Sequence, residues 1–272
     1  MSGCSITAVV ITRNEERNLP GFLANVRQVA DEVIIVDDGS TDATVQIAQT
    51  AGGYVRLISR TMGEGGFAAQ RNAGIDAAKG DWILNMDCDE RLSPDLVDEL
   101  CATLPDTKLA AYRYRRLNYF MHRPMCYGGW ASWNLPQIAR RRAHRFEGRL
   151  HETCVIEGGE AMIGQMSGVM HHLNDFDLAQ RFSKSAQYTA MEADRIAANG
   201  TVPVSALWWR PLREFLKKYL AQQGFRDGVP GFVAAMHSAT AAFRAYALAW
   251  DRQNALSRKE LEAQCTQTGR QR

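Results

Sequence analysis

The chain has 272 residues, of which 46% are hydrophobic and 23% are charged, and its formal net charge is +2. This composition is typical of a folded globular protein with a substantial core, and it excludes a disordered or low-complexity chain. A net charge so close to zero argues against a dedicated nucleic-acid-binding protein. We therefore expect no nucleic-acid partner.

The cysteines are scattered along the chain and form no CxxC pair. Zinc sites and disulfide frameworks need recognisable cysteine spacings, so we expect free thiols in a reducing compartment. The first residues lack a basic segment followed by an apolar core, and we expect no signal peptide. No uninterrupted apolar run is long enough to cross a bilayer. We therefore expect a cytoplasmic location.

Buried strands and amphipathic helices alternate along the N-terminal part of the chain. The runs that are apolar or β-branched enough for buried strands are 6–12, 33–36, 54–58 and 81–86. Helical spacing of apolar residues follows each of the first three runs. This βαβαβαβ order predicts an α/β fold with a parallel sheet and helices on both faces. In such sheets, ligands bind outside the carboxyl ends of the strands.

Polar clusters stand at these carboxyl ends: RNE at 13–15, DDGSTD at 37–42 and DCDE at 87–90. A tight turn with a helix cap is the alternative explanation for the second cluster. The first strand is followed by TRNEE, so neither GxGxxG nor GxxxxGK[ST] is present there. The phosphates of a ligand are therefore not held mainly by a glycine turn. Acids after the second strand are well placed to bind a base or a ribose.

Asp87 and Asp89 are the sharpest candidates for a metal site. In an extended backbone they would point to one side of the sheet and Cys88 to the other. Two carboxylates in one small volume favour Mg²⁺ or Mn²⁺, with waters and phosphate oxygens as further ligands. The alternative is that one of the two acids caps the helix that Pro94 opens. A metal beside a diphosphate suits a nucleoside diphosphate sugar.

The motifs AVVITRNEERNL, VIIVDDGSTDATVQIA, AAQRNAGIDAAKGDWILNMDCDERL and GRLHE (148–152) resemble those of one enzyme family. It is the large family of inverting glycosyltransferases of the family 2 type, with a GT-A fold and a DxD motif. The HH pair at 171–172, Lys184, Tyr188 and the segment 210–236 are similar to bacterial cell-surface glycan enzymes. Among these are the β-1,4-glucosyltransferases of the lipopolysaccharide core.

The resemblance implies a domain organisation. Residues 1–175 would form the GT-A catalytic domain, with a Rossmann-like nucleotide-sugar-binding half over 1–105 that holds a mostly parallel sheet. The acceptor side would span 106–175, where short strands of mixed direction are expected. Residues 176–272 would form a helical C-terminal region.

The resemblance also implies roles for individual residues. The residues implied to line the nucleoside pocket are Thr12, Asn14, Glu15, Asp37 and Asp38. Arg71 would approach the base or the diphosphate, although most arginines are surface residues and this is its alternative. Asp87 would contact the ribose and the metal, and Asp89 the metal.

Trp130 and Trp133 are candidates for the acceptor site, because indole faces stack on sugar rings. Ordinary packing is the alternative for both. The motif departs here from the family pattern, which often has an acid within GGWASW and an arginine near Gln137. His172 could reach the acceptor or the diphosphate, or it could be a packed core histidine.

Glu152 is our candidate for the catalytic base. Transfer with inversion needs one group that takes the proton of the acceptor hydroxyl as that oxygen attacks the anomeric carbon. His151 would orient Glu152 or lie near the metal and phosphates. The alternative is that Glu152 only pairs with one of the nearby arginines, which are Arg140, Arg141, Arg142 and Arg149.

Residues 207–250 combine aromatic residues with cations on an amphipathic pattern, which is typical of a segment at a bilayer interface. Residues 200–272 hold 11 lysines and arginines against 5 acidic residues, so anionic lipid would attract them. The alternative is packing on the catalytic domain or on a partner. His237 and Arg244 would be costly inside a membrane, which argues against a span.

These features predict a metal-dependent inverting glycosyltransferase. It would use a UDP-sugar, with glucose favoured, and a lipid-linked cell-surface glycan such as the lipopolysaccharide core. It would work as a peripheral protein at the inner face of the bacterial cytoplasmic membrane. Two alternatives stay open: transfer to polyprenyl phosphate or protein, and a catalytically silent nucleotide-sugar-binding scaffold in a membrane assembly.

Overall fold

The computed structural model describes residues 4–131, 134–148, 152–174 and 176–268, without the side chains of Gln187 and of 266–268. The chain divides into two compact units. The first unit comprises Met1–Tyr119 and Trp130–Asn174, and the C-terminal unit comprises Phe120–Gly129 and Asp175–Arg272.

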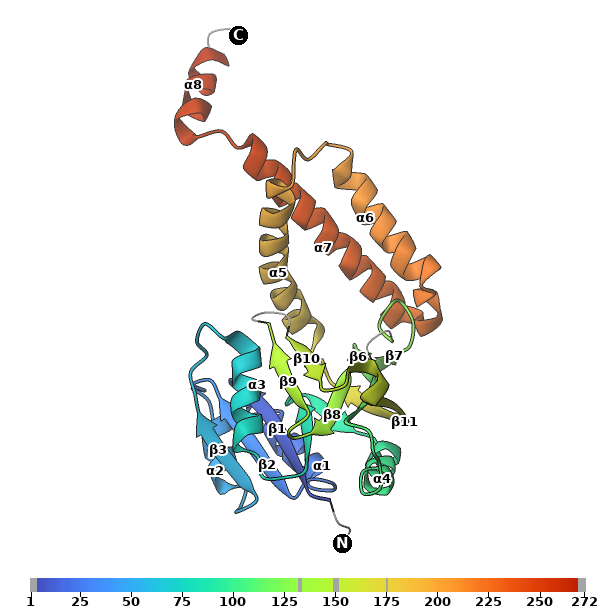
Figure 1. The fold of residues 1–272 in the computed structure, drawn as a ribbon. Helices are drawn as coiled ribbons and strands as arrows, with labels where there is room; N and C mark the ends of the chain where they lie inside the picture. The colour runs from blue at the N-terminus through green and yellow to red at the C-terminus, as the bar shows by residue number, and fades with distance from the viewer. Residues whose placement is uncertain (1–3, 132–133, 149–151, 175, 269–272) are drawn as a thin grey trace. The chain divides into compact units, whose positions relative to one another are not determined.

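The first unit is built on a mixed sheet (Figure 1). Its strands are β1 (Ile6–Thr12), β2 (Glu32–Asp37), β3 (Val55–Ser59), β4 (Trp82–Met86), β5 (Glu90–Leu92), β6 (Ala111–Phe120), β8 (Pro136–Arg140) and β11 (Ile163–His172), in the spatial order β3-β2-β1-β4-β8-β6-β11-β5. The first four strands of that order run parallel, and β8 is antiparallel to both of its neighbours. A separate antiparallel pair joins β9 (His144–Glu147) and β10 (Thr153–Ile156). The predicted α/β class, mostly parallel at first and mixed later, is confirmed.

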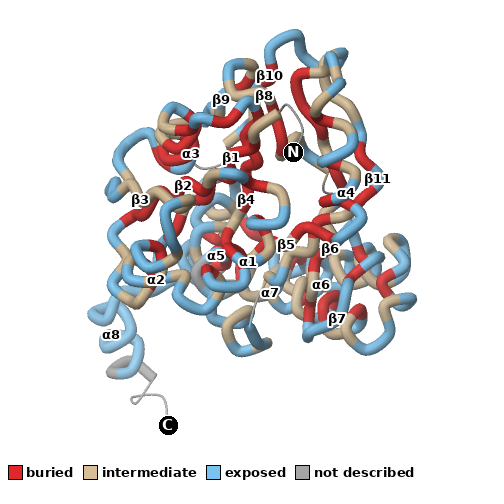
Figure 2. Tube along the Cα trace, turned by 90° about the horizontal axis from the view of Figure 1, so that it is seen from below, coloured by how far each residue is buried: buried red, intermediate tan, exposed pale blue. Residues whose placement is uncertain are grey.

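Helices cover both faces of the parallel strands because β1 is apolar on both sides. Ala8 and Val10 belong to the core formed with α1 (Leu19–Val26) and α4 (Pro94–Thr103). Val9 joins a second core with Ile75 of α3 (Gly66–Ala77). The remaining helix of this half is α2 (Thr44–Thr50). Figure 2 shows β1, β2 and β4 buried along most of their length. The two-residue alternation of the strand therefore sets which helix each side chain meets.

The register of the parallel strands brings their polar ends together. Thr12 of β1 lies opposite Asp37 of β2, and Val10 lies opposite Met86 of β4. Because all these strands run in one direction, the residues that follow them meet at one edge of the sheet.

The backbone around Asp87 and Asp89 differs from the extended segment that the sequence predicted. Strand β4 ends at Met86, and the next residues turn, with the Asp87 carbonyl accepting from the Glu90 N–H at 3.1 Å. Neither acid caps α4, because the Ser93 hydroxyl accepts from the Leu96 N–H at 3.2 Å. A turn, and not strand alternation, therefore places the two acids.

The C-terminal unit is helical. Its elements are β7 (Arg123–Met125), α5 (Leu178–Ala198), α6 (Ala206–Leu216), the π-helical turn η2 (Lys217–Ala221), the 3₁₀ turn η3 (Gly224–Asp227), α7 (Gly228–Asn254) and α8 (Arg258–Thr268). The Asp227 carboxylate accepts from the N–H groups of Cys126 and Tyr127, which joins the 120–129 segment to these helices. In the described part of the chain, no helix has both the length and the apolar character of a transmembrane span.

A substitution at Gly74 tests how closely α3 packs on the sheet. A methyl group at this position would lie 2.4 Å from Cγ1 of Val9 and 3.3 Å from Cγ2 of Val36. Both valines are β-branched and cannot easily turn away. Overpacking costs about 1–3 kcal/mol, whereas the helix-propensity gain of alanine over glycine is at most about 1 kcal/mol. We therefore expect Gly74→Ala to lower the urea midpoint.

Gly53→Ala is the matched control, since a methyl group there would meet nothing within 4 Å. We expect this variant to stay within about 0.5 kcal/mol of the parent chain. A Gly74→Ala chain as stable as the control would show that α3 does not pack on β1 and β2 as described.

Candidate active site

A first cavity of about 450 Å³ lies at the carboxyl edge of β1, β2 and β4. Its lining residues are Ile11, Thr12, Arg13, Glu15, Val36, Asp38, Met62, Phe67, Gln70, Asp87, Cys88, Asp89 and His172. All the polar clusters predicted to meet at this edge contribute to it. No role for Met62, Phe67 or Gln70 could be predicted from the sequence, because a contact across such a cavity has no local signature.

Two of the predicted nucleoside-binding residues brace the wall of this cavity. Asp37 is 2% exposed, and its carboxylate accepts from the hydroxyls of Thr12 and Ser40. Asn14 has a φ of +58°, and its side-chain oxygen accepts from the Thr41 N–H at 2.7 Å. These bonds join the carboxyl ends of β1 and β2 and the loops that follow them.

Asp38 and Glu15 line the cavity directly. Asp38 Oδ1 accepts from the Met62 N–H at 2.6 Å, and its other oxygen lies 3.1 Å from Arg13. Glu15 accepts from the Asn18 amide at 2.8 Å. The cavity wall is therefore acidic and rich in hydrogen-bond acceptors, which suits hydroxyl and amide groups of a ligand.

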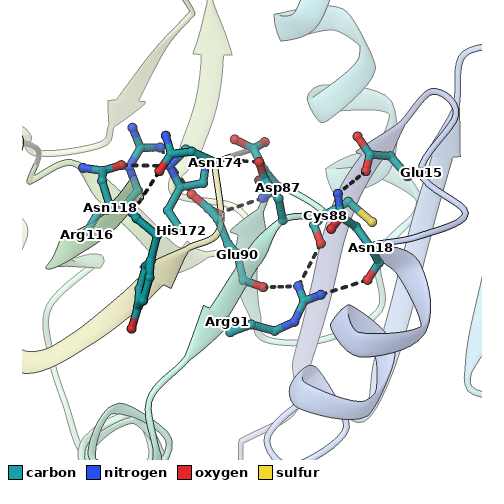
Figure 3. Close-up of polar contacts among 12 residues, drawn as sticks. Glu15, Asn18, Asp87, Cys88, Glu90, Arg91, Arg116, Asn118, His172 and Asn174 are labelled. Atoms are coloured by element: carbon teal, nitrogen blue, oxygen red, sulfur yellow. Dashed lines mark hydrogen bonds and ion pairs between the residues drawn. The ribbon is translucent and has the colours of Figure 1, made fainter. Parts of the chain in front are cut away.

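Arg91 holds the acidic turn in place (Figure 3). Its guanidinium donates to the Cys88 carbonyl at 2.8 Å and to the Asn18 carbonyl at 2.9 Å. Asp87, Cys88 and Asp89 all line the cavity, and Cys88 is buried in its wall. One arginine thus fixes the turn against the start of α1, although nothing in the local sequence pattern predicted this role.

His172 faces the same cavity as Asp89. Its Nε2 lies 3.2 Å from Asp89 Oδ2, and its Nδ1 lies 2.8 Å from the Asn118 side-chain oxygen. The Asn118 amide in turn donates to the backbone carbonyl of Trp130 at 2.8 Å. The candidate acceptor residues His172 and Trp130 are therefore connected through Asn118.

A second cavity of about 350 Å³ adjoins the first and shares Asp87 with it. Its other lining residues are Arg71, Arg116, Leu135, Pro136, Gln137, Phe146, Glu152, Thr153 and Cys154. Arg71 lies between two acids there: its terminal nitrogen is 2.7 Å from Asp87 Oδ1, and its Nε is 3.2 Å from Glu152 Oε1. Arg71 is thus a buried residue of this site and not a surface arginine.

Two of the alternative partners considered for Glu152, Arg140 and Arg141, make other contacts. Arg140 donates to the carbonyls of Thr107 and Leu109, and Arg141 donates to the Gly80 carbonyl. Glu152 pairs with Arg71, which is 81 residues away in sequence. Arg149, His151 and Trp133 lie outside the described residues.

Burial and neighbouring charge act in opposite directions on the ionisable groups of this site. Burial alone would raise the pKa of Asp87, but the Arg71 guanidinium outweighs it, and the pKa lies below its ordinary value. Burial lowers the pKa of Arg71, but Asp87 and Glu152 more than reverse this and raise it. Burial raises the pKa of the Cys88 thiol, so this cysteine is a poor nucleophile.

Asp87 and Asp89 fit a hard divalent cation. Both carboxylates reach the first cavity, and oxygen donors are the ligands that Mg²⁺ and Mn²⁺ prefer. Within the described residues, no group of three or more His, Cys, Asp or Glu side chains forms a metal site by itself. A cation bound here would therefore take further oxygens from water or from phosphates, as Mg²⁺ sites commonly do.

Comparison with known proteins identifies a family. The sequence profile described as glycosyl transferase family 2 matches residues 7–158, which is more than half of the chain. An uncharacterized glycosyltransferase, RT0209, from Rickettsia typhi is 27% identical over 260 residues, covering 88% of this chain and 84% of that protein. The lipopolysaccharide core biosynthesis glycosyltransferase LpsC from Rhizobium meliloti is 28% identical over 253 residues, covering 88% of this chain and 89% of that protein.

Among solved structures, residues 1–349 of TarS from S. aureus align with a TM-score of 0.47 and 16% sequence identity over 93% of each chain. The same protein in complex with UDP-GlcNAc aligns with a TM-score of 0.46 and 14% identity.

Glu90 provides a pH test of the described site. It is 1% exposed, and burial together with the negative charge of Asp87 raises its pKa from 4.5 to about 8. Between these values the folded chain keeps a proton that the unfolded chain has released, so this group reduces stability as pH rises through that window.

We expect Glu90→Gln, measured by urea unfolding without divalent metal, to gain stability relative to the parent chain as pH rises from 5 to 8. Since one unit of pKa difference is worth about 1.4 kcal/mol, the difference should reach about 1 kcal/mol or more. Glu64→Gln, at an exposed position, is the control and should show no such trend. Parallel pH profiles for Glu90→Gln and the parent chain would contradict the burial of Glu90.

Proposed function

This chain belongs to glycosyl transferase family 2, and on that premise we propose that it transfers a sugar, with glucose favoured, from a UDP-sugar to a lipid-linked cell-surface glycan. It would have the GT-A fold predicted from its motifs, and the parallel order of β3, β2, β1 and β4 supports this. One observation carries the proposal. An acidic nucleotide-sized cavity and a second cavity with a positioned carboxylate share Asp87.

The first cavity is the proposed donor site. Its volume of about 450 Å³ lies in the range of ligand pockets. Thr12, Glu15 and Asp38 would contact the nucleoside, with Asp37 and Asn14 bracing the wall behind them. The sugar and diphosphate would extend toward Asp87 and Asp89.

Asp87 and Asp89 would hold Mg²⁺ or Mn²⁺ beside the diphosphate. Such a cation, when bound, supplies charge neutralisation at the departing diphosphate. His172 lies against Asp89 and would orient that carboxylate. Arg71 would keep Asp87 directed at the boundary between the two cavities.

Glu152 is the proposed base in the second cavity. The acceptor oxygen would bond to the anomeric carbon from the face opposite the diphosphate, which inverts that centre. The carbon–oxygen bond to the diphosphate would break, its electron pair would leave with the diphosphate, and Glu152 would take the hydroxyl proton. Arg71 would orient Glu152 through their 3.2 Å contact.

The acceptor is proposed to be a glycan such as the lipopolysaccharide core. The likeness to the Rhizobium meliloti LpsC protein supports this acceptor class. Trp130 and His172, joined through Asn118, would contact the acceptor. Residues 207–250 would contact the membrane surface at the cytoplasmic face, where a lipid-linked acceptor is held.

Asp89→Ala tests the metal assignment. Removing this carboxylate should reduce sugar transfer by about 100-fold or more, a usual loss when one electrostatic group of an active site is deleted. It should also abolish the gain in UDP affinity on adding Mn²⁺. The measurements are product formation from UDP-glucose and UDP titration with and without Mn²⁺.

Asp98→Ala removes an exposed carboxylate from α4 and should behave as the parent chain. Turnover of Asp89→Ala close to that of Asp98→Ala would refute the metal assignment.

Glu152→Gln tests the base. The variant should keep the donor affinity of the parent chain, while kcat falls by about 10²–10⁴-fold, the usual contribution of general base catalysis. Donor affinity is measured by UDP-sugar titration and kcat with saturating acceptor. Glu157→Gln, at an exposed position nearby, should change neither quantity. An unchanged kcat in Glu152→Gln would remove Glu152 from this role.

A further inference from the structure

The C-terminal unit contains a cavity of about 460 Å³ that the proposed transfer reaction does not use. It is formed by the end of α5, the 199–205 connection, the first residues of α6 and Tyr246 of α7. These three helices lie side by side (Figure 1). All of its lining residues belong to the C-terminal unit.

The walls of this cavity are fixed by one side chain of α7. The Gln253 amide accepts from the Val202 N–H at 2.9 Å and donates to the carbonyls of Gly200 and Ala197 at 2.8 and 3.1 Å. Small buried residues pack beneath the connection, among them Ala193, Ala206 and Ala249. The cavity is therefore part of a packed, hydrogen-bonded structure.

The rim of the cavity combines exposed indoles with an arginine. Trp208 is 62% exposed and Trp209 is 49% exposed. The Arg210 guanidinium lies 5.3 Å from the centre of the Tyr246 ring. In the described part of the chain, no carboxylate lies within ion-pair distance of Arg210, whereas Arg195 on the same rim is paired with Glu192. Arg210 therefore offers an uncompensated positive charge.

The exposed apolar surface continues along α6 and η2. Leu212, Leu216 and Leu220 follow Trp208 at intervals of four residues, and each is exposed. Side chains four apart lie on one face of a helix. Exposed cations, among them Arg213 and Lys217, accompany this apolar row. Apolar, aromatic and basic residues on one helix are typical of a segment that lies in a bilayer interface.

The charge of this region indicates which kind of ligand the cavity binds. Residues 200–272 hold 11 lysines and arginines against 5 acidic residues, which complements an anionic bilayer. Trp and Tyr side chains prefer the depth of the lipid headgroups, where one side of the ring is apolar and the other is wet. A cavity at that depth with a free guanidinium matches a phosphate group, because arginine binds phosphate oxygens in a fixed geometry.

We propose that this cavity binds the phosphate of an anionic phospholipid headgroup, with Arg210 as its ligand and Trp208 and Trp209 at headgroup depth. This inference rests on the membrane contact in the proposed function and deepens it, since it names the lipid chemistry and the residues that recognise it.

Sedimentation of the full chain with vesicles tests the site, and no sugar donor or acceptor is needed. We expect binding to phosphatidylcholine vesicles that contain about 30% phosphatidylglycerol to exceed binding to pure phosphatidylcholine. Arg210→Gln should weaken this binding by about 20-fold or more. Arg213→Gln, which removes the same charge outside the cavity, should weaken it by no more than about fivefold, the effect of one basic residue near the surface.

Trp208→Ala should also weaken vesicle binding, and its thermal melting curve should match that of the parent chain if the fold is intact. Equal losses for Arg210→Gln and Arg213→Gln would overturn the headgroup site and leave only a diffuse basic surface. Equal binding to both vesicle types would also overturn it. A different result would be a chain that does not bind vesicles but forms a dimer in sedimentation velocity. If Trp208→Ala abolishes that dimer, the face binds a second copy of the chain.

The vesicle assay and the transfer assay test the two proposals separately. A chain that binds anionic vesicles through Arg210 but does not transfer sugar would preserve this inference and refute the proposed reaction. A chain that transfers sugar to a detergent-dispersed acceptor but does not bind vesicles would refute this inference and preserve the proposed reaction. Arg210→Gln should transfer sugar to the dispersed acceptor at the parent rate.

Discussion

The site depends on the parallel register of β1 between β2 and β4. Thr12 lies opposite Asp37 and Val10 opposite Met86, so the loops after all three strands open at one edge. This register is maintained by the cores on both faces, because a slip of one residue would turn every side chain of β1 to the opposite face. The packing that maintains the register of the sheet therefore also determines the geometry of the acidic edge.

The charges at this edge form a connected set in which Arg71 is central. A buried guanidinium is costly unless its charge is matched, and here it is matched by Asp87 and Glu152 together. Arg71 lies on α3, which packs closely on the sheet at Gly74. The Arg71 guanidinium lies 5.4 Å from the centre of the Phe146 ring. The structure thus fixes two acids from distant parts of the chain before any ligand arrives, and such preorganisation is favourable for charge-dependent chemistry.

The fold and the polar edge could be predicted from periodicity, because runs such as 6–12 and 33–36 are β-branched and apolar over nearly their whole length and are followed by polar residues. The turn at Asp87 could not, since it depends on Arg91 reaching the Asn18 carbonyl, a contact between segments far apart in sequence. The pairing of Arg71 with Glu152 escaped prediction for the same reason. Asp37 and Asn14 were predicted to line the nucleoside pocket, but their side-chain bonds are to the adjoining loops, and a local pattern does not show which way a polar side chain turns.

Asp87 belongs to the walls of both cavities of the first unit. A ligand that draws this carboxylate toward one cavity necessarily changes the surface of the other. A ligand that shifts Asp87 in one cavity would therefore change the affinity of the other cavity, and this coupling would have the same magnitude whichever cavity is filled first.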